Sequence, residues 1–140
     1  MTGVWIALAA LALTLAFGGY RRLTDGRAKS VRTAPSLDAG ALGSPLGSQA
    51  TFVQFSATVC APCRATHRVL AEIAADTEGV RHIDLNAETR LDLVEEFGIT
   101  RTPTVLLLDA DGVVRNRIVG AARKSEVVNA LQQVDRAVAA

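Results

Sequence analysis

The chain has 140 residues, of which 49% are apolar and 4% aromatic, with 15 basic residues, 14 acidic residues and two cysteines. This length accommodates one folded domain of ordinary size. The near-neutral charge argues against a strongly basic nucleic-acid binder, so we expect no nucleic-acid partner, and two cysteines are too few for the disulfide framework of a small secreted protein.

The first predicted element is a membrane-spanning helix over an uncharged run from Gly3 to Tyr20. A helix of this length rises by about 27 Å, which is close to the ~30 Å hydrocarbon core of a bilayer. Trp5 and Tyr20 stand near its two ends, where aromatic side chains favour the membrane interfaces. A helix buried in a soluble domain rarely needs so long an uncharged run. We therefore expect a transmembrane anchor over residues 1–20 that contacts the membrane through residues 3–20.

A cleaved signal peptide is also N-terminal and apolar, but its sequence signatures are missing. No basic residue precedes the apolar run, and no Ala-x-Ala-like cleavage site closes it before Arg21. Basic residues follow the run instead, at Arg21, Arg22, Arg27, Lys29 and Arg32. By the positive-inside rule, this pattern predicts a single-pass cell-membrane protein with its N-terminus outside and the following domain in the cytoplasm. The same residues also suit contact with anionic lipid headgroups, which stays open beside the topological interpretation.

Residues 21–48 are predicted to be a basic juxtamembrane segment followed by a flexible linker. Past Arg32 the segment is rich in small and polar residues, with several glycines and prolines, a composition typical of a tether. One helical turn over Ser36 to Leu42, with Leu37 and Leu42 docked on the domain, would move the domain boundary to about Ser36. The sequence leaves that boundary open.

Residues 49–140 are predicted to form one globular domain. Short β-branched and apolar runs indicate strands at residues 51–55, 80–85 and 104–108. A turn at residues 109–112 leads to a fourth strand at 113–119. Apolar residues at helical spacing indicate helices at 62–75, 91–97 and 124–138. This order of elements predicts an α/β fold with a mixed four- to five-stranded sheet and helices on both faces.

The residues that carry chemistry stand at the first junction between a strand and a helix. Cys60-Ala61-Pro62-Cys63 begins the helix that follows the strand at residues 51–55. A thiol at a helix N-terminus faces unsatisfied N–H groups and the positive end of the helix dipole, which lower its pKa. Cys60 is expected to be that thiol, and Pro62 fits the first helical turn. Cys63 lies one turn further on, less exposed and within reach of Cys60 for a disulfide.

Four features together resemble the thioredoxin family: the Cys60–Cys63 pair, the strand before it, the tripeptide Thr102-Pro103-Thr104 before a buried strand, and Val119-Gly120-Ala121 after the hairpin. The resemblance covers roughly residues 50–138, although a clear first strand and helix are missing. It implies a thioredoxin-like three-layer fold and a thiol-disulfide oxidoreductase without a cofactor. It also implies protein disulfides as substrates and a reductase or other electron donor as a partner.

By the same resemblance, Cys60 is the attacking thiolate and Cys63 is the resolving thiol. Pro103 would be a cis-proline that faces the pair, and Thr102 would offer its backbone to an extended substrate. The residues expected to complete an apolar docking surface are Val119, Gly120 and Ala121. The residues expected to support the active site are Val59, Ala61, Pro62, Gln54 and His82.

Three positions depart from the pattern of the family. Val59 stands where thioredoxins usually have a tryptophan before the first cysteine, and Gln54 stands where they have a buried aspartate that assists proton removal from the resolving thiol. His82 stands where a lysine often lies near that aspartate. An amide cannot act as a base. His82 either takes over proton handling or is a hydrogen-bonded structural residue, and both interpretations stay open.

Two other functions compete with redox catalysis. Cys60, Cys63 and His67 would offer three ligands to Cu(I) or Zn in a metal-binding or metallochaperone module. No second cysteine pair supplies a fourth ligand, so we expect no metal, and His67 beside Arg64 and Arg68 is interpreted as a solvated residue. A redox-inert interaction domain would account for Gln54 and Val59, but it leaves the cysteine pair unexplained.

Overall fold

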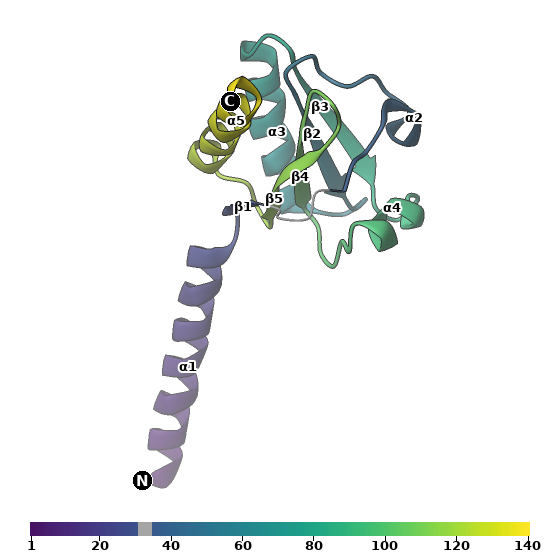
Figure 1. Cartoon of the computed structure of the whole chain (residues 1–140). Coiled ribbons are helices and arrows are strands. Elements are labelled where there is room, and N and C mark those ends of the chain that lie inside the picture. Colours follow the sequence, from purple (N-terminus) through teal and green to yellow (C-terminus); the bar gives the residue numbers. More distant parts are fainter. Residues whose placement is uncertain (31–34) are drawn as a thin grey trace.

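A computed structural model describes residues 1–30 and 35–140, and Arg32, one of the predicted basic residues, lies outside these ranges. Figure 1 shows a long helix, α1 (Thr2–Thr24), that projects from a domain built on one sheet. The strands of the described residues are β1 (Ala28–Ser30), β2 (Ala50–Ser56), β3 (Val80–Asn86), β4 (Thr104–Asp109) and β5 (Val114–Val119). The other helices are α2 (Ala39–Leu42), α3 (Ala61–Asp76), α4 (Leu91–Glu96) and α5 (Lys124–Ala139).

The sheet is mixed, and within the described residues its strand order is β1-β5-β4-β2-β3. β2 runs parallel to β3, whereas β4 is antiparallel to both β2 and β5. Every residue of β4 is buried, which explains why its sequence TVLLLD is a continuous apolar run rather than an alternating one. β2 is buried in the same way up to Phe55. The predicted α/β fold with a mixed sheet is confirmed.

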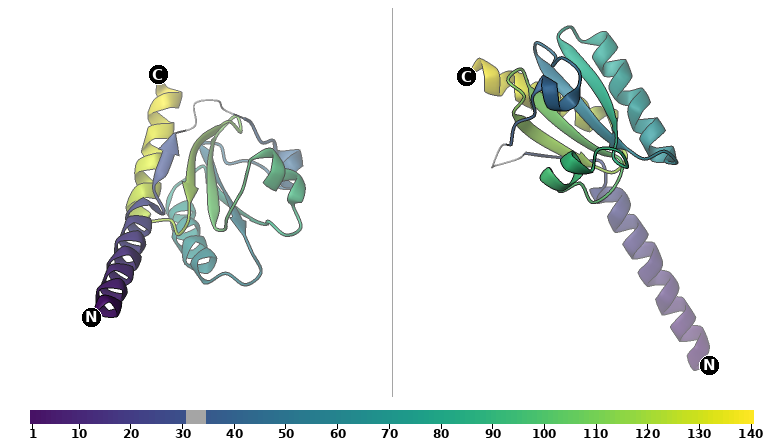
Figure 2. Two further views of the ribbon diagram at one scale, coloured as in Figure 1. Left: turned by 90° about the horizontal axis from the view of Figure 1, so that it is seen from below. Right: turned by 90° about the vertical axis from the view of Figure 1, so that its right-hand side faces the viewer.

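Helices α3 and α5 lie on one face of the sheet and α2 and α4 on the other (Figure 2), and an apolar layer lies under each pair. On one face, Leu70 of α3 and Val127 of α5 pack against Phe52 of β2. On the other face, Leu93 of α4 packs against Phe55 of β2. Burial of a side chain of this size contributes about 1.5–3 kcal/mol. The first of these layers holds α3, and with it the cysteine pair at its start, against the sheet.

The prediction of a flexible linker over residues 21–48 is corrected by the structure in two places. Ala28–Ser30 forms the edge strand β1, which pairs antiparallel with β5. Leu37 and Leu42 are buried in the layer under α4, as the open alternative expected. A strand of three residues with a lysine at its centre has no hydrophobic period, so the sequence pattern could not indicate it.

Backbone hydrogen bonds attach the same segment to the turn between β4 and β5. The N–H of Leu37 donates to the carbonyl of Gly112, and the N–H of Val114 donates to the carbonyl of Pro35. Asp38 caps α2 by accepting from the N–H of Ala41 at 2.7 Å. Gly112 has φ +80°, and a Cβ there would lie 2.2 Å from the carbonyl oxygen of Leu37. The packing therefore requires glycine at this position.

Candidate active site

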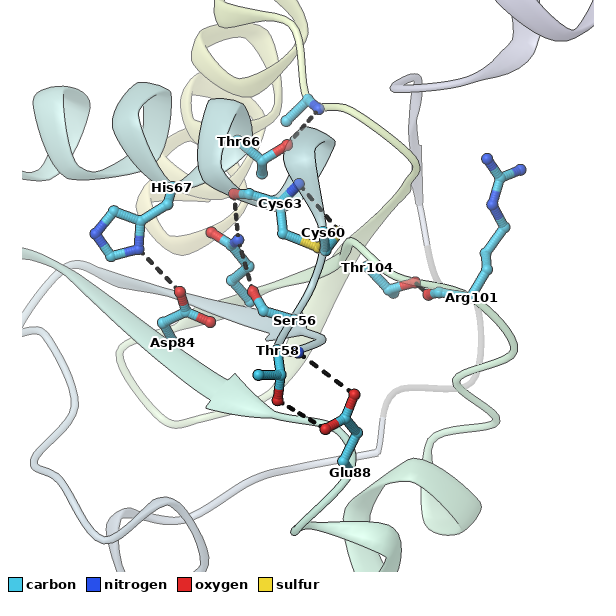
Figure 3. The surroundings of a disulfide bond; sticks show 12 residues. Ser56, Thr58, Cys60, Cys63, Thr66, His67, Asp84, Glu88, Arg101 and Thr104 are labelled. Carbon is cyan, nitrogen blue, oxygen red and sulfur yellow. Dashed lines mark hydrogen bonds and ion pairs between the residues drawn. A yellow bond between two sulfur atoms is a disulfide. The ribbon is translucent and has the colours of Figure 1, made fainter.

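The two cysteines form a disulfide at the first turn of α3 (Figure 3). Cys60 is the N-cap of the helix, and its Sγ accepts a hydrogen bond from the N–H of Cys63 at 3.2 Å. Pro62 lies in the first turn, where the missing N–H costs no helical hydrogen bond. Cys63 is only 3% exposed, whereas Cys60 is partly exposed. In the reduced protein, an N–H that points at Cys60 Sγ favours the thiolate over the thiol. The sequence predicts the same effect from the place of Cys60 at the helix start.

On one side of the disulfide, most of the predicted substrate-binding residues line a single hollow of about 420 Å³. Its walls include Pro62, Thr102, Pro103, Gly120 and Ala121. The peptide bond between Thr102 and Pro103 is cis, and the carbonyl of Pro103 accepts from the N–H of Gly120 at 2.8 Å. This hydrogen bond joins the two loops that form the hollow.

The predicted residues Val119, Val59 and Ala61 do not line that hollow, and Ala61 is exposed at the start of α3. The carbonyl of Val119 accepts a hydrogen bond from the N–H of Gly26. Val59, which replaces the tryptophan usual in the family, is 91% exposed. The side chain of Val59 therefore packs little against the rest of the domain.

Gln54 occupies the buried position beneath Cys63 and has no exposed surface. Its Nε2 donates to the carbonyl oxygen of Cys63 at 2.9 Å and to Ser56 Oγ at 2.8 Å. Its Oε1 lies 3.1 Å from His82 Nε2. All its polar groups are therefore engaged, and the amide holds α3 to the sheet instead of serving as a base.

The contacts of His82 favour the structural interpretation over proton handling. Because Gln54 Oε1 is an acceptor, His82 must donate from Nε2, which fixes the neutral tautomer. Burial, together with the nearby His67, lowers the pKa of His82 to about 4. The ring is therefore neutral at physiological pH and already committed to Gln54.

His67 is not simply a solvated residue between two arginines, as the sequence suggested. Its Nδ1 lies 2.9 Å from Asp84 Oδ2, and its ring meets that of His82 edge to face with centroids 4.7 Å apart. A second hollow, of about 340 Å³, is lined by both cysteines together with His67 and Asp84. Figure 3 shows His67 and Asp84 on one side of the disulfide and Thr104 and Arg101 on the other.

The metal-binding alternative requires at least three ligand side chains close together. Among residues 1–30 and 35–140, no group of three or more His, Cys, Asp or Glu side chains is arranged to hold a metal ion.

Sequence reasoning missed Asp84 and Ser56. The signal for Asp84 was the parallel register of β2 and β3, which pairs Gln54 with Asp84, but register depends on contacts that a single sequence does not display.

A cysteine pair that closes a disulfide at a helix start, beside a hollow formed by a cis-proline loop, defines the site of a thiol-disulfide oxidoreductase. The Thioredoxin family model matches residues 44–133. The chain therefore belongs to the thioredoxin family, whose members are thiol-disulfide oxidoreductases.

Individual relatives agree with this assignment. The chain is 33% identical over 112 residues to a thioredoxin of Mycolicibacterium smegmatis, and the match covers 78% of this chain and 96% of that protein. It is also 33% identical over 83 residues to the chloroplastic thioredoxin M3 of Oryza sativa subsp. japonica, a match that covers 59% of this chain and 47% of the rice protein.

Solved structures agree on the fold. The long form of spinach chloroplast thioredoxin f matches with a TM-score of 0.55 and 24% identity, over 63% of this chain and 72% of that one. The oxidised mitochondrial thioredoxin 3 of Saccharomyces cerevisiae matches with a TM-score of 0.54 and 24% identity, over 61% of this chain and 78% of that one. The three-layer thioredoxin-like fold expected from the sequence is confirmed.

The pKa of His82 gives a pH dependence of stability that a substitution isolates. Because its pKa is about 4 in the folded chain, against an ordinary value of 6.5, the unfolded chain binds more protons between these values. The free energy of unfolding should therefore fall as the pH drops from 6.5 to 4, with a share from His82 of about 1–2 kcal/mol, reduced because the ring retains contact with solvent.

His82→Gln is the matched variant, since its side-chain amide still donates to Gln54 but does not titrate. Urea unfolding of the full chain in mild detergent, followed by circular dichroism, measures the free energy of unfolding at each pH. The variant should lose less stability than the wild type across this interval. If the free energy of unfolding falls equally with pH in both proteins, the pH dependence does not come from His82.

Proposed function

We propose that the protein is a membrane-tethered thiol-disulfide oxidoreductase that acts on protein disulfides through Cys60 and Cys63. The observation that carries this proposal is the disulfide at the first turn of α3, with a partly exposed Cys60 and a buried Cys63. A more accessible thiol attacks a substrate, and a shielded one resolves the intermediate. A reductase or other electron donor is required to return the pair to the dithiol.

The reaction runs in two exchange steps. The Cys60 thiolate attacks one sulfur of the substrate disulfide, which forms a mixed disulfide and releases the first substrate sulfur as a thiolate. Cys63 then loses its proton and attacks Cys60 Sγ, which forms the Cys60–Cys63 disulfide and releases the second substrate sulfur. Two electrons pass from the cysteine pair to the substrate, and the proton of Cys63 ends on a substrate thiolate.

The hollow beside Pro103 is the proposed substrate site. Thr102 and Pro103 lie in its wall next to Gly120 and Ala121, and Val59 offers an exposed apolar contact beside Cys60. An extended segment of the substrate that binds there places its disulfide next to Cys60.

Helix α1 supports the tether. It is the one helix of the described residues that is long and apolar enough to cross a membrane, a test that a signal sequence also passes. None of its residues is buried against the domain. Its apolar surface therefore needs an apolar environment outside the chain. The basic residues after the span support a cytoplasmic domain and an N-terminus outside.

We place the start of the thioredoxin-like domain near Asp25 rather than at residue 49. Asp25 pairs with Arg101, β1 extends the sheet, and Leu37 and Leu42 lie in the core. The anchor and the domain are then joined by very few residues.

Reduction of insulin by the full chain in detergent, with dithiothreitol as the electron source, tests the dithiol chemistry. Wild-type protein should accelerate insulin precipitation, and Cys60→Ser should abolish the acceleration because no nucleophile remains. Cys63→Ser should stop turnover and accumulate the mixed disulfide with insulin, which mass spectrometry detects. Activity that survives Cys60→Ser would rule out the proposed nucleophile.

Labelling with a membrane-impermeant maleimide tests the orientation. In the Cys63→Ser variant, where Cys60 is a free thiol, Cys60 should be labelled only after the cells are permeabilised. The matched control carries Thr2→Cys in a Cys60→Ser/Cys63→Ser background, and its thiol should be labelled in intact cells. Labelling of Cys60 in intact cells would show that the domain lies outside, which is opposite to the proposed topology. Recovery of a soluble chain that lacks residues 1–20 would show that the segment is a cleaved signal peptide.

A further inference from the structure

The end of α1 forms part of the hollow beside the disulfide. Gly18, Arg21 and Arg22 line this hollow together with the loops that carry Pro103 and Gly120. Figure 1 shows α1 meeting the domain at the end of the sheet where β1 and β5 lie. The proposed substrate site and the proposed membrane anchor therefore share a wall.

Several contacts fix this arrangement. The guanidinium of Arg101 donates to both carboxylate oxygens of Asp25, at 3.1 and 2.9 Å, and lowers the pKa of that carboxyl. The N–H of Gly26 donates to the carbonyl of Val119 at 2.9 Å. Arg123 also donates to the backbone carbonyl of Arg22. Only residues 25–27 separate α1 from β1, so the domain has little freedom to swing on its anchor.

The position of Tyr20 places the hollow at the membrane surface. Tyr20 ends the predicted span, and Asp25 lies five residues later, which is about 8 Å along a helix. The headgroup layer on each side of a bilayer is about as thick as that distance. A substrate site lined by Gly18 and Arg22 therefore opens towards the headgroups rather than towards bulk water.

We propose that the substrates are membrane proteins whose disulfide lies in a juxtamembrane segment, a few residues from their own transmembrane helix. This inference rests on the proposed function and names its substrate class. A substrate disulfide held at the same distance from the membrane as Cys60 has a high effective concentration at the hollow, because both proteins diffuse in the plane of the membrane. The charged residues that line the hollow are Arg21, Arg22, Arg101, Arg123 and Asp25, an excess of positive charge that favours an acidic juxtamembrane segment.

The test uses the full chain reconstituted in phosphatidylcholine vesicles with two model substrates. Both are single-span peptides with the same disulfide loop, placed within about five residues of the span in one and about 40 residues away on a Gly/Ser linker in the other. Soluble insulin is the third substrate. The near disulfide should be reduced at least about ten-fold faster than the distant one.

A variant with about 20 Gly/Ser residues inserted between Thr24 and Asp25 frees the domain from α1 and keeps the contact between Asp25 and Arg101. Its near and distant disulfides should be reduced at similar rates, and it should still reduce insulin, because the cysteine pair and the contact between Asp25 and Arg101 remain in place. The same insertion after Ala140 is the matched control and should keep the preference for the near disulfide.

Each other outcome overturns one specific claim. Equal rates in the wild type, or a preference that persists in the linker variant, overturn the inference about juxtamembrane substrates. If the near disulfide is preferred only when phosphatidylglycerol is added, the basic residues bind lipid headgroups. That result overturns the claim that they recognise an acidic segment of the substrate. Absence of insulin reduction overturns the proposed function itself.

A separate observation concerns the hollow on the other side of the disulfide. Cys63 and His67 are four residues apart on α3, which places their side chains on the same face of the helix. Both line the hollow of about 340 Å³ together with Asp84. Asp84 accepts from His67 Nδ1 at 2.9 Å, which leaves Nε2 as the acceptor nitrogen. Gln54 cannot accept a proton, so another group must.

We infer that His67 accepts the proton of Cys63 in the second exchange step. The proton moves from Cys63 Sγ to His67 Nε2, directly or through water that this hollow is large enough to admit. The Cys63 thiolate then attacks Cys60 Sγ, and the imidazolium, stabilised by Asp84, later protonates the departing substrate thiolate. The other charged or titratable groups that face His67 are Arg64, Arg68 and His82.

The pH dependence of the resolving step tests this role in His67→Gln. Stopped-flow measurement in the reconstituted full chain should show resolution at least about ten-fold slower at pH 7. The difference should shrink as the pH rises, because hydroxide then removes the proton of Cys63 without a base from the protein. Formation of the mixed disulfide, measured in a Cys63→Ser background, should be unchanged. A constant ratio across pH, or equal rates, would overturn the proton-transfer role.

Discussion

The hydrogen bonds of one buried amide tie the active site to the sheet. Gln54 sits in the middle of the fully buried part of β2 and bonds Cys63 of α3, Ser56 at the end of β2 and His82 of β3. A buried polar group left without partners costs about 1–3 kcal/mol, so each of these bonds favours the position of α3 on the sheet that satisfies the amide. They set the position of the first turn of α3, from which the exposure of Cys60, the burial of Cys63 and the two hollows all follow.

The two cysteines differ in exposure although both line the same hollow. Cys60 and Cys63 both border the hollow that contains His67 and Asp84, but Cys60 is partly exposed whereas Cys63 is 3% exposed. The hollow beside the Thr102–Pro103 loop has Pro62, which lies between the two cysteines in the chain, in its wall. Attack requires access and resolution requires a proton acceptor. The exposure of Cys60 and the hydrogen bond of His67 with Asp84 in the hollow beside Cys63 fit these two proposed steps.

Much of this architecture could be predicted from the sequence, because its signals are local. The TVLLL run of β4, the turn after Asp109 and the CAPC sequence at a helix start each depend on neighbouring residues, and the structure places them as expected. The strand β1, the partner of His67 and the contact of Asp25 with Arg101 could not be predicted, since each joins segments far apart in the chain. A three-residue strand and a carboxylate on a half-exposed strand leave no periodic pattern to detect.

The connection between α1 and the domain depends on backbone packing more than on charge. The ion pair of Asp25 with Arg101 is about one-third exposed on each side, and a pair of that kind contributes at most about 1 kcal/mol. Gly26 adds a geometric restraint, because its φ is +77° and a Cβ would lie 2.2 Å from the carbonyl oxygen of Ala121. The pairing of β1 with β5 then continues the restraint into the sheet. These contacts fix the direction in which α1 leaves the domain, so the orientation that the proposed tether would give the domain is built into the fold.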